Sequence, residues 1–106
     1  MQLELNAPQI AASAFRALRA AYPPMRDYRV QQLGRTQEDL AYIVQFAASA
    51  RLVDDPAILE DMLEWLRTLL ASRSVPSSAV TAGLEVLAPL IDVIDPLAGE
   101  LVRDAF

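Results

Sequence analysis

Acidic side chains form the most concentrated group of residues in this sequence that could do chemistry. Glu60, Asp61 and Glu64 are spaced to share one helix face, and Asp54 and Asp55 precede them. Paired carboxylates can hold a divalent cation, or exchange protons as general acid and base. The same spacing is typical of a solvated helix face with an acid capping its start. We favour the solvated face, and therefore predict neither a metal site nor catalytic residues here.

Histidine and cysteine are both missing from the 106 residues. Without them the chain cannot build a Ser-His-Asp or Cys-His nucleophile, a Cys/His zinc site, a Cys-ligated iron–sulfur cluster or a disulfide. A di-iron helical bundle also needs His in its Glu-x-x-His ligand pairs. We therefore expect a protein that is not an enzyme and that uses no cofactor and no metal.

Aromatic side chains are the second group that could form a site. A pocket between helices, suited to a small apolar ligand, would be walled by Phe15, Tyr22, Tyr42, Phe46 and Trp65. Tyr22, Tyr28, Tyr42 and Trp65, with Arg26, Arg29 and Arg35 around the first two, could likewise line a pocket. Two other interpretations of these four rings stay open. They fill the core with their polar tips at its edge, or they belong to a protein interface, where aromatic residues and Arg are enriched.

The charge of the chain argues against nucleic acid as a partner. The formal net charge is −5, whereas binding to phosphates depends on neutralising them with Lys and Arg. A helix-turn-helix could use Arg26, Arg29 and Arg35, but its recognition helix would begin with Glu38 and Asp39, which repel phosphate. We expect no nucleic-acid partner.

Helices must position all of these residues, because apolar side chains recur every three to four positions and no alternating run or hairpin turn is present. Pro23 ends the first helix, Thr36 begins a later one with a Thr-x-x-Asp capping pattern, and Asp-Pro pairs start two more. The predicted helices cover about 7–22, 36–52, 56–72, 77–94 and 96–106, with a short helix or turn over 25–33 that ends at Gly34. The fold class is all-α, a single-domain bundle of five to six helices over residues 1–106.

Apolar surface exceeds what a domain of this size readily buries, since 54% of the residues are hydrophobic. In the helix over 56–72 the apolar face spans about 160°, against about 100° for an ordinary surface helix, so we expect this helix to be central. The helix over 77–94 carries a second apolar stripe. Exposed apolar patches mark contact sites, so we predict a two-fold homodimer. Its candidate interface is Trp65, Leu69, Val86, Leu90 and Val93.

The chain also lacks the signals of secretion and membrane insertion. Its first ten residues have neither a basic region nor an apolar stretch typical of a secretory signal. No uncharged apolar run approaches 18 residues. We expect a cytoplasmic protein with no membrane partner.

Residues 28–76 resemble a helical module found in bacterial multi-domain regulatory proteins, where it precedes sensory or cobalamin-binding domains. The similar features are Tyr22-Pro23, Gly34-Arg35, Glu38-Asp39, Tyr42, Glu64-Trp65-Leu66 and Val75-Pro76. The family pattern has His after the tyrosine, whereas Ile43 follows Tyr42 here. The resemblance implies a regulatory accessory role and, without a cobalamin-binding motif, no cofactor.

Together the features of the sequence predict a non-enzymatic, self-associating interaction or regulatory module. The alternative is a sensor or carrier of an apolar ligand.

Overall fold

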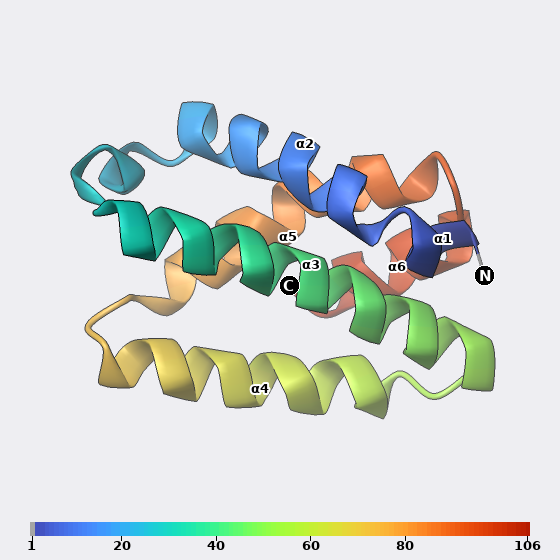
Figure 1. Cartoon of the computed structure of the whole chain (residues 1–106). Helices are drawn as coiled ribbons and strands as arrows, with labels where there is room; N and C mark the ends of the chain where they lie inside the picture. The colour runs from blue at the N-terminus through green and yellow to red at the C-terminus, as the bar shows by residue number, and fades with distance from the viewer. Residues whose placement is uncertain (1) are drawn as a thin grey trace.

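The computed structural model describes residues 2–106 and consists of helices joined by short turns (Figure 1). The elements are α1 (Gln2–Leu5), α2 (Ala7–Ala21), the 3-10 helix η1 (Pro23–Asp27), α3 (Val30–Val53), α4 (Ala57–Ser72), α5 (Ser77–Asp92) and α6 (Pro96–Asp104). No strand occurs within residues 2–106. The prediction of an all-α bundle of five to six helices is confirmed.

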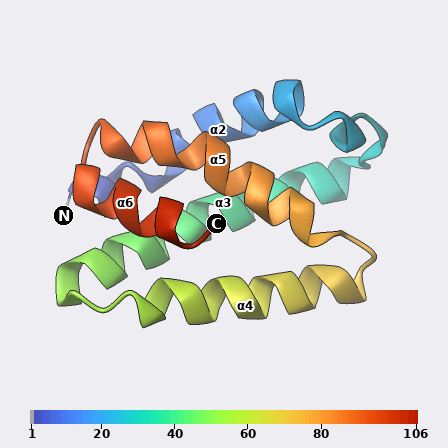
Figure 2. The same ribbon diagram turned by 180° about the vertical axis from the view of Figure 1, so that it is seen from behind.

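The central element of the bundle is α3, not α4. α3 packs against α1, α2, α4, α5 and α6, whereas the main contacts of α4 are with α3 and α5 alone. In Figures 1 and 2, α4 forms the lower edge of the molecule, α2 runs along the upper edge, and α3 lies between them. The expectation that the helix over 56–72 is central is therefore wrong. Its core contact is a single stripe made of Leu59, Met62, Leu63 and Leu66.

The start of α3 differs from the sequence prediction. The helix begins at Val30, not Thr36. The backbone N–H of Arg29 donates to the Gln32 side-chain oxygen at 2.8 Å, so Gln32 caps the first turn. The Thr36 hydroxyl donates to the Gln32 carbonyl at 2.8 Å, as it does inside a helix. Gly34 therefore lies within α3 and does not terminate a helix.

Two aspartates mark helix starts where the Asp-Pro pairs predicted them. The Asp55 carboxylate accepts a hydrogen bond from the Ala57 N–H at 3.1 Å. The Asp95 carboxylate accepts from the N–H groups of Leu97 and Ala98, at 3.1 and 3.3 Å. Such bonds satisfy backbone donors that have no partner within the helix. They set the first turns of α4 and α6.

α6 is held against the bundle by two ion pairs and one close approach. Arg103 pairs with Asp92 of α5, and Arg51 at the end of α3 lies 3.5 Å from Asp95. A Cβ at Gly99 would collide with the Asp92 carboxyl group, so the glycine makes room for that side chain. These contacts fix the position of α6 against α3 and α5.

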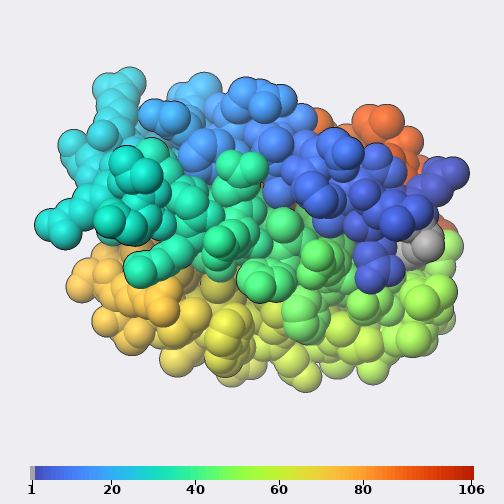
Figure 3. Space-filling view, in the orientation of Figure 1, coloured from blue at the N-terminus to red at the C-terminus, as the bar shows by residue number. Residues whose placement is uncertain are grey.

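The described chain has the dimensions of one small domain. Its radius of gyration is 12.8 Å, close to the about 13 Å of a compact domain of 100 residues. Figure 3 shows α2, α3 and α4 as successive bands across one face. Within the described part, no helix has the length and apolar character to cross a membrane.

Candidate functional site

A cavity of about 250 Å³ lies where η1, α3, α4 and the start of α5 meet. A cavity of this size has room for one small organic molecule. Its lining residues are Leu18, Tyr22, Met25, Tyr28, Gln32, Arg35, Thr36, Asp39, Leu40, Ile43, Leu66, Leu70, Arg73, Val75, Ala79, Val80 and Gly83. Residues of α2, η1, α3, α4 and α5 thus line one hollow.

The cavity has an apolar floor and a charged mouth. Its fully buried lining residues are apolar, and they include Leu40, Ile43 and Leu66. Arg35 and Arg73 are exposed, which places them at the opening. An occupant would therefore meet hydrocarbon inside and guanidinium groups at the rim.

Gly83 helps to shape the inner wall of the cavity. A Cβ at this position would come within 3.3 Å of Leu40 Cδ2, tighter than an ordinary contact. The missing side chain lets α5 approach α3 closely beneath the cavity.

Asp39 is the half-buried acid in the wall of the cavity. Burial is the main cause that raises the pKa of its carboxyl group. The charge of Arg73 lowers this pKa, that of Glu38 raises it, and that of Arg35 lowers it, with the net shift upward. Among residues 2–106, neither an ion pair nor a side-chain hydrogen bond engages this carboxylate. The cavity therefore contains a partly desolvated negative charge flanked by two positive ones.

Two tyrosines close the end of the cavity near η1. The Tyr22 hydroxyl lies 3.2 Å from the Ser78 hydroxyl, a hydrogen bond that links the end of α2 to the start of α5. Burial raises the pKa of the Tyr28 phenol, and the neighbouring Tyr22 raises it further. Tyr28 therefore stays protonated at neutral pH and can donate a hydrogen bond.

Of the five rings expected to wall a pocket, Tyr22 alone lines this cavity. Phe15 packs half-buried against the core, with the Arg19 guanidinium carbon 5.8 Å from the centre of its ring. Tyr42, Phe46 and Trp65 are at the surface, with exposed fractions of 53%, 39% and 62%. The pocket exists, but its walls are largely other residues.

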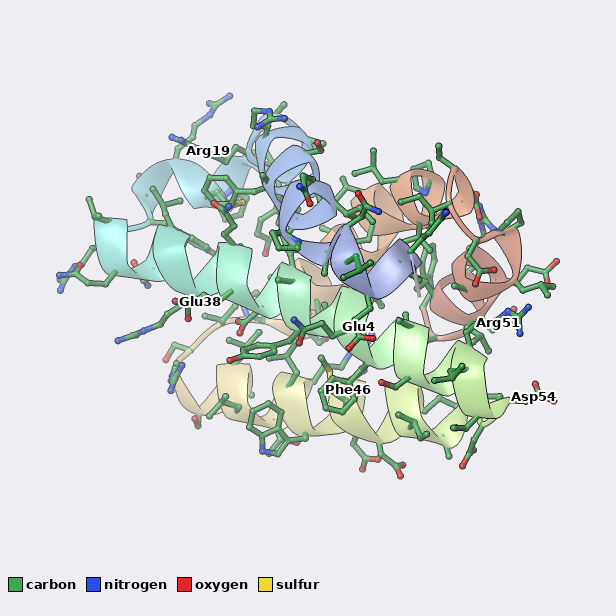
Figure 4. The ribbon with its side chains drawn as sticks, turned by 45° about the vertical axis from the view of Figure 1, so that its right-hand side comes forward. Glu4, Arg19, Glu38, Phe46, Arg51 and Asp54 are labelled. Atoms are coloured by element: carbon green, nitrogen blue, oxygen red, sulfur yellow. The ribbon has the colours of Figure 1, made fainter. Side chains whose placement is uncertain are left out.

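Tyr42, Phe46 and Trp65 constitute what we call the aromatic patch. α3 and α4 run antiparallel from the turn at 54–56, so the middle of one lies beside the middle of the other (Figure 1). Figure 4 shows Phe46 on the side of α3 toward α4. Tyr42 and Phe46 are four residues apart on one face of α3, and Trp65 belongs to the neighbouring α4, at the lower edge of the molecule in Figure 1.

The predicted interface residues do not form one continuous surface. Trp65 and the half-buried Leu69 belong to α4, whereas Leu90 and Val93 border a shallow hollow beside α2. Val86 and Leu90 are half-buried against the core, and Val93 is 85% exposed. Because α2 and α4 lie at opposite edges of the bundle (Figures 1 and 2), the set divides into two places.

The acids of α4 lie on its outer face. Glu60, Asp61 and Glu64 are all exposed, as expected of a solvated helix face. Residues 2–106 contain no group of three or more His, Cys, Asp or Glu side chains arranged to hold a metal ion.

Comparison of the sequence with protein-family models and with curated protein sequences gives no match.

Proposed function

We propose that this protein is a non-enzymatic helical interaction module that binds a second copy of itself through the aromatic patch. The observation that carries this proposal is the exposure of three large rings on two adjacent helices at one edge of a small domain. Aromatic residues are enriched at interfaces, and contiguous exposed apolar groups mark contact surfaces. Tyr42 and Phe46 join Trp65 in this surface, whereas Val86, Leu90 and Val93 do not.

The charges of α4 are unevenly distributed along its length. Its first half carries Glu60, Asp61 and Glu64, whereas residues 65–72 contain no acid. A two-fold axis near Trp65 would set two α4 helices antiparallel, so that the acidic half of each lies beside the acid-free half of the other. A second copy placed in this way avoids setting like charges against each other.

Sedimentation equilibrium at micromolar protein concentration tests the association. We expect twice the chain mass of 11.6 kDa, and a shift toward the monomer in Trp65→Ser, because truncating a central aromatic anchor removes about 2 kcal/mol or more of binding energy. Val30→Ser is the matched control, because Val30 is 82% exposed at the far end of α3. A wild-type protein that sediments as a clean monomer sinks the proposal.

A regulatory role in a bacterial cytoplasm is the setting that we propose for this association. It is supported by the resemblance of residues 28–76 to the helical module of bacterial regulatory proteins.

The second candidate function is that of a sensor or carrier of a small apolar ligand. It is favoured by the 250 Å³ cavity and its apolar floor. A ligand present at one hundred times its Kd would stabilise the fold by about 2.7 kcal/mol. Thermal unfolding in the presence of a panel of hydrophobic metabolites measures this effect, and a panel without any stabilising member argues against the function.

A further inference from the structure

We infer that the cavity takes an apolar α-amino acid, with its side chain on the apolar floor and its zwitterionic head at the charged mouth. The inference rests on the second candidate function, that the cavity is a ligand site, and it specifies the chemical class of the ligand. Four observations support it: the signs of the charges, the nature of the floor, the size of the cavity and the missing partner of Asp39.

The charges in the cavity wall complement a zwitterion. Asp39 provides one carboxylate, and Arg35 and Arg73 provide guanidinium groups on the same cavity. An α-amino acid presents an ammonium and a carboxylate on adjacent atoms of one molecule. The ammonium would pair with Asp39, and the carboxylate would accept hydrogen bonds from an arginine, whose planar donor fork fits a carboxylate.

A ligand with a single charge fits this wall less well. A carboxylic acid would satisfy the arginines but would face the Asp39 carboxylate. An amine would satisfy Asp39 but would face two guanidinium groups. A zwitterion avoids both repulsions, and a carboxylic acid would in addition leave the partly desolvated Asp39 carboxylate unpaired.

The floor and the volume of the cavity define the rest of the ligand. Leu40, Ile43 and Leu66 are almost completely buried, so the inner end of the cavity offers no polar partner. A volume of about 250 Å³ accepts a side chain the size of that in leucine or phenylalanine together with its head. Glycine would leave the floor uncovered.

The backbone of α3 and of the turn after α4 sets the points from which the polar groups reach the cavity. Arg35 and Asp39 are four residues apart on α3, so their side chains leave the same helix face one turn from each other. Arg73 directly follows the last turn of α4, in the chain reversal where Ser74 has a φ of 62°. Asp39 lacks a side-chain partner within the described residues, and an ammonium group would supply one.

Isothermal titration calorimetry of the wild-type protein tests the inference with one ligand and its fragments. The probes are L-leucine; glycine, which has the head alone; 4-methylpentanoate, which lacks the ammonium; and 3-methylbutylamine, which lacks the carboxylate. L-Phenylalanine is titrated as a second full ligand. We expect at least one of the two amino acids to bind about tenfold or more tightly than each fragment, because each fragment leaves a charge or the floor without a partner.

Two substitutions locate the binding at the charged mouth. Asp39→Asn and Arg73→Gln should each raise the Kd for the bound amino acid about tenfold, because each removes one charged partner. Asp27→Asn and Arg26→Gln are the matched controls, since both residues lie in η1, are exposed and do not line the cavity. The controls should bind as the wild type does, and circular dichroism verifies that all four variants are folded.

The outcomes separate this inference from the function on which it rests. If 4-methylpentanoate or 3-methylbutylamine binds as tightly as L-leucine, the inference is overturned while an apolar-ligand function survives. An amino acid that binds equally well to Asp39→Asn and Arg73→Gln overturns it too. If neither the amino acids nor the hydrophobic panel bind, both the inference and the ligand function fail.

Discussion

At the scale of single residues, the placement of Asp39 lowers the stability of the fold. Its carboxylate is partly withdrawn from water, and burial outweighs the neighbouring arginines in raising its pKa. Arg73 and Arg35 lessen this cost without removing it, so Asp39 lies in the cavity wall at the expense of stability.

The pH dependence of stability follows from the sign of the Asp39 shift. The ordinary pKa of 3.8 applies to the unfolded chain, and the folded value is higher. Below 3.8 the group is protonated in both states and costs nothing. As the pH rises through the interval between the two values, the unfolded chain binds fewer protons than the folded one, so the free energy of unfolding falls. Arg73 and Arg35 limit this loss, and Glu38 adds to it.

Asp39→Asn should therefore be more stable than the wild type at pH 7, because it removes the desolvated charge. This advantage should disappear below pH 3.8, where the wild-type carboxyl is itself neutral. Urea unfolding at a series of pH values measures it, with Asp27→Asn as the exposed control. An advantage that is equally large at low pH would falsify this account, because it could not come from the charge of Asp39.

At the scale of the elements, the continuity of α3 through Gly34 is open to test. Gly34 is an exposed residue inside the helix, and no atom lies within 4 Å of the position its Cβ would take. Gly34→Ala should stabilise the protein by about 1 kcal/mol, since alanine is the better helix former. In a domain of this size that corresponds to a rise in Tm of about 4–8 °C.

Gly83→Ala is the matched control for this helix, because its new methyl group would meet Leu40 at 3.3 Å. It should give a smaller gain, or a loss. If Gly34→Ala destabilises the protein, the chain at this position is not helical, and a break at Gly34 is the better description.

The sequence predicted most helices but misplaced the start of α3, and the reason is physical. A Thr-x-x-Asp capping pattern is a local signal worth about 1 kcal/mol. A helix that begins at Val30 gains two further turns, and it packs Leu33 against the core. Such tertiary contacts are not visible in a local pattern, so Thr36 was predicted as a cap.

The same misplaced start hid the place of Asp39 in the wall of the cavity. Arg35 was grouped with Tyr22 and Tyr28 around a pocket, but Asp39 was predicted as a capping acid of the first helical turn. Once α3 begins at Val30, the spacing of Gln32, Arg35 and Asp39 shows a polar stripe beside the apolar one. Arg73 lies far along the chain, and only the packing of α3 and α4 brings it to the same cavity.

At the scale of the whole molecule, the width of an apolar face did not predict a central position. The width of the apolar face depends on the residues of α4 alone, whereas the position of α4 depends on which other helices pack against it. α3 takes the centre because it is the longest helix and has neighbours along its full length. α4 is left at the edge, with Trp65 on the outside. The excess of apolar residues predicted a contact surface. In the structure that prediction applies to the edge formed by α4, where Trp65 is exposed.

Self-association links folding to protein concentration, and this gives a whole-molecule prediction. If the dimer forms only from folded chains, a tenfold higher protein concentration should stabilise each folded dimer by about 1.4 kcal/mol, so the Tm should rise. Scanning calorimetry over the micromolar range measures that slope. In Trp65→Ser the Tm should depend less on concentration than in the wild type, whereas Val30→Ser should keep the wild-type slope because its change lies outside the aromatic patch. A wild-type Tm that does not change with concentration, over the range in which sedimentation detects a dimer, would show that the two copies associate without stabilising the fold. That result would contradict the proposal, in which the partner covers Tyr42, Phe46 and Trp65 only when the chain is folded.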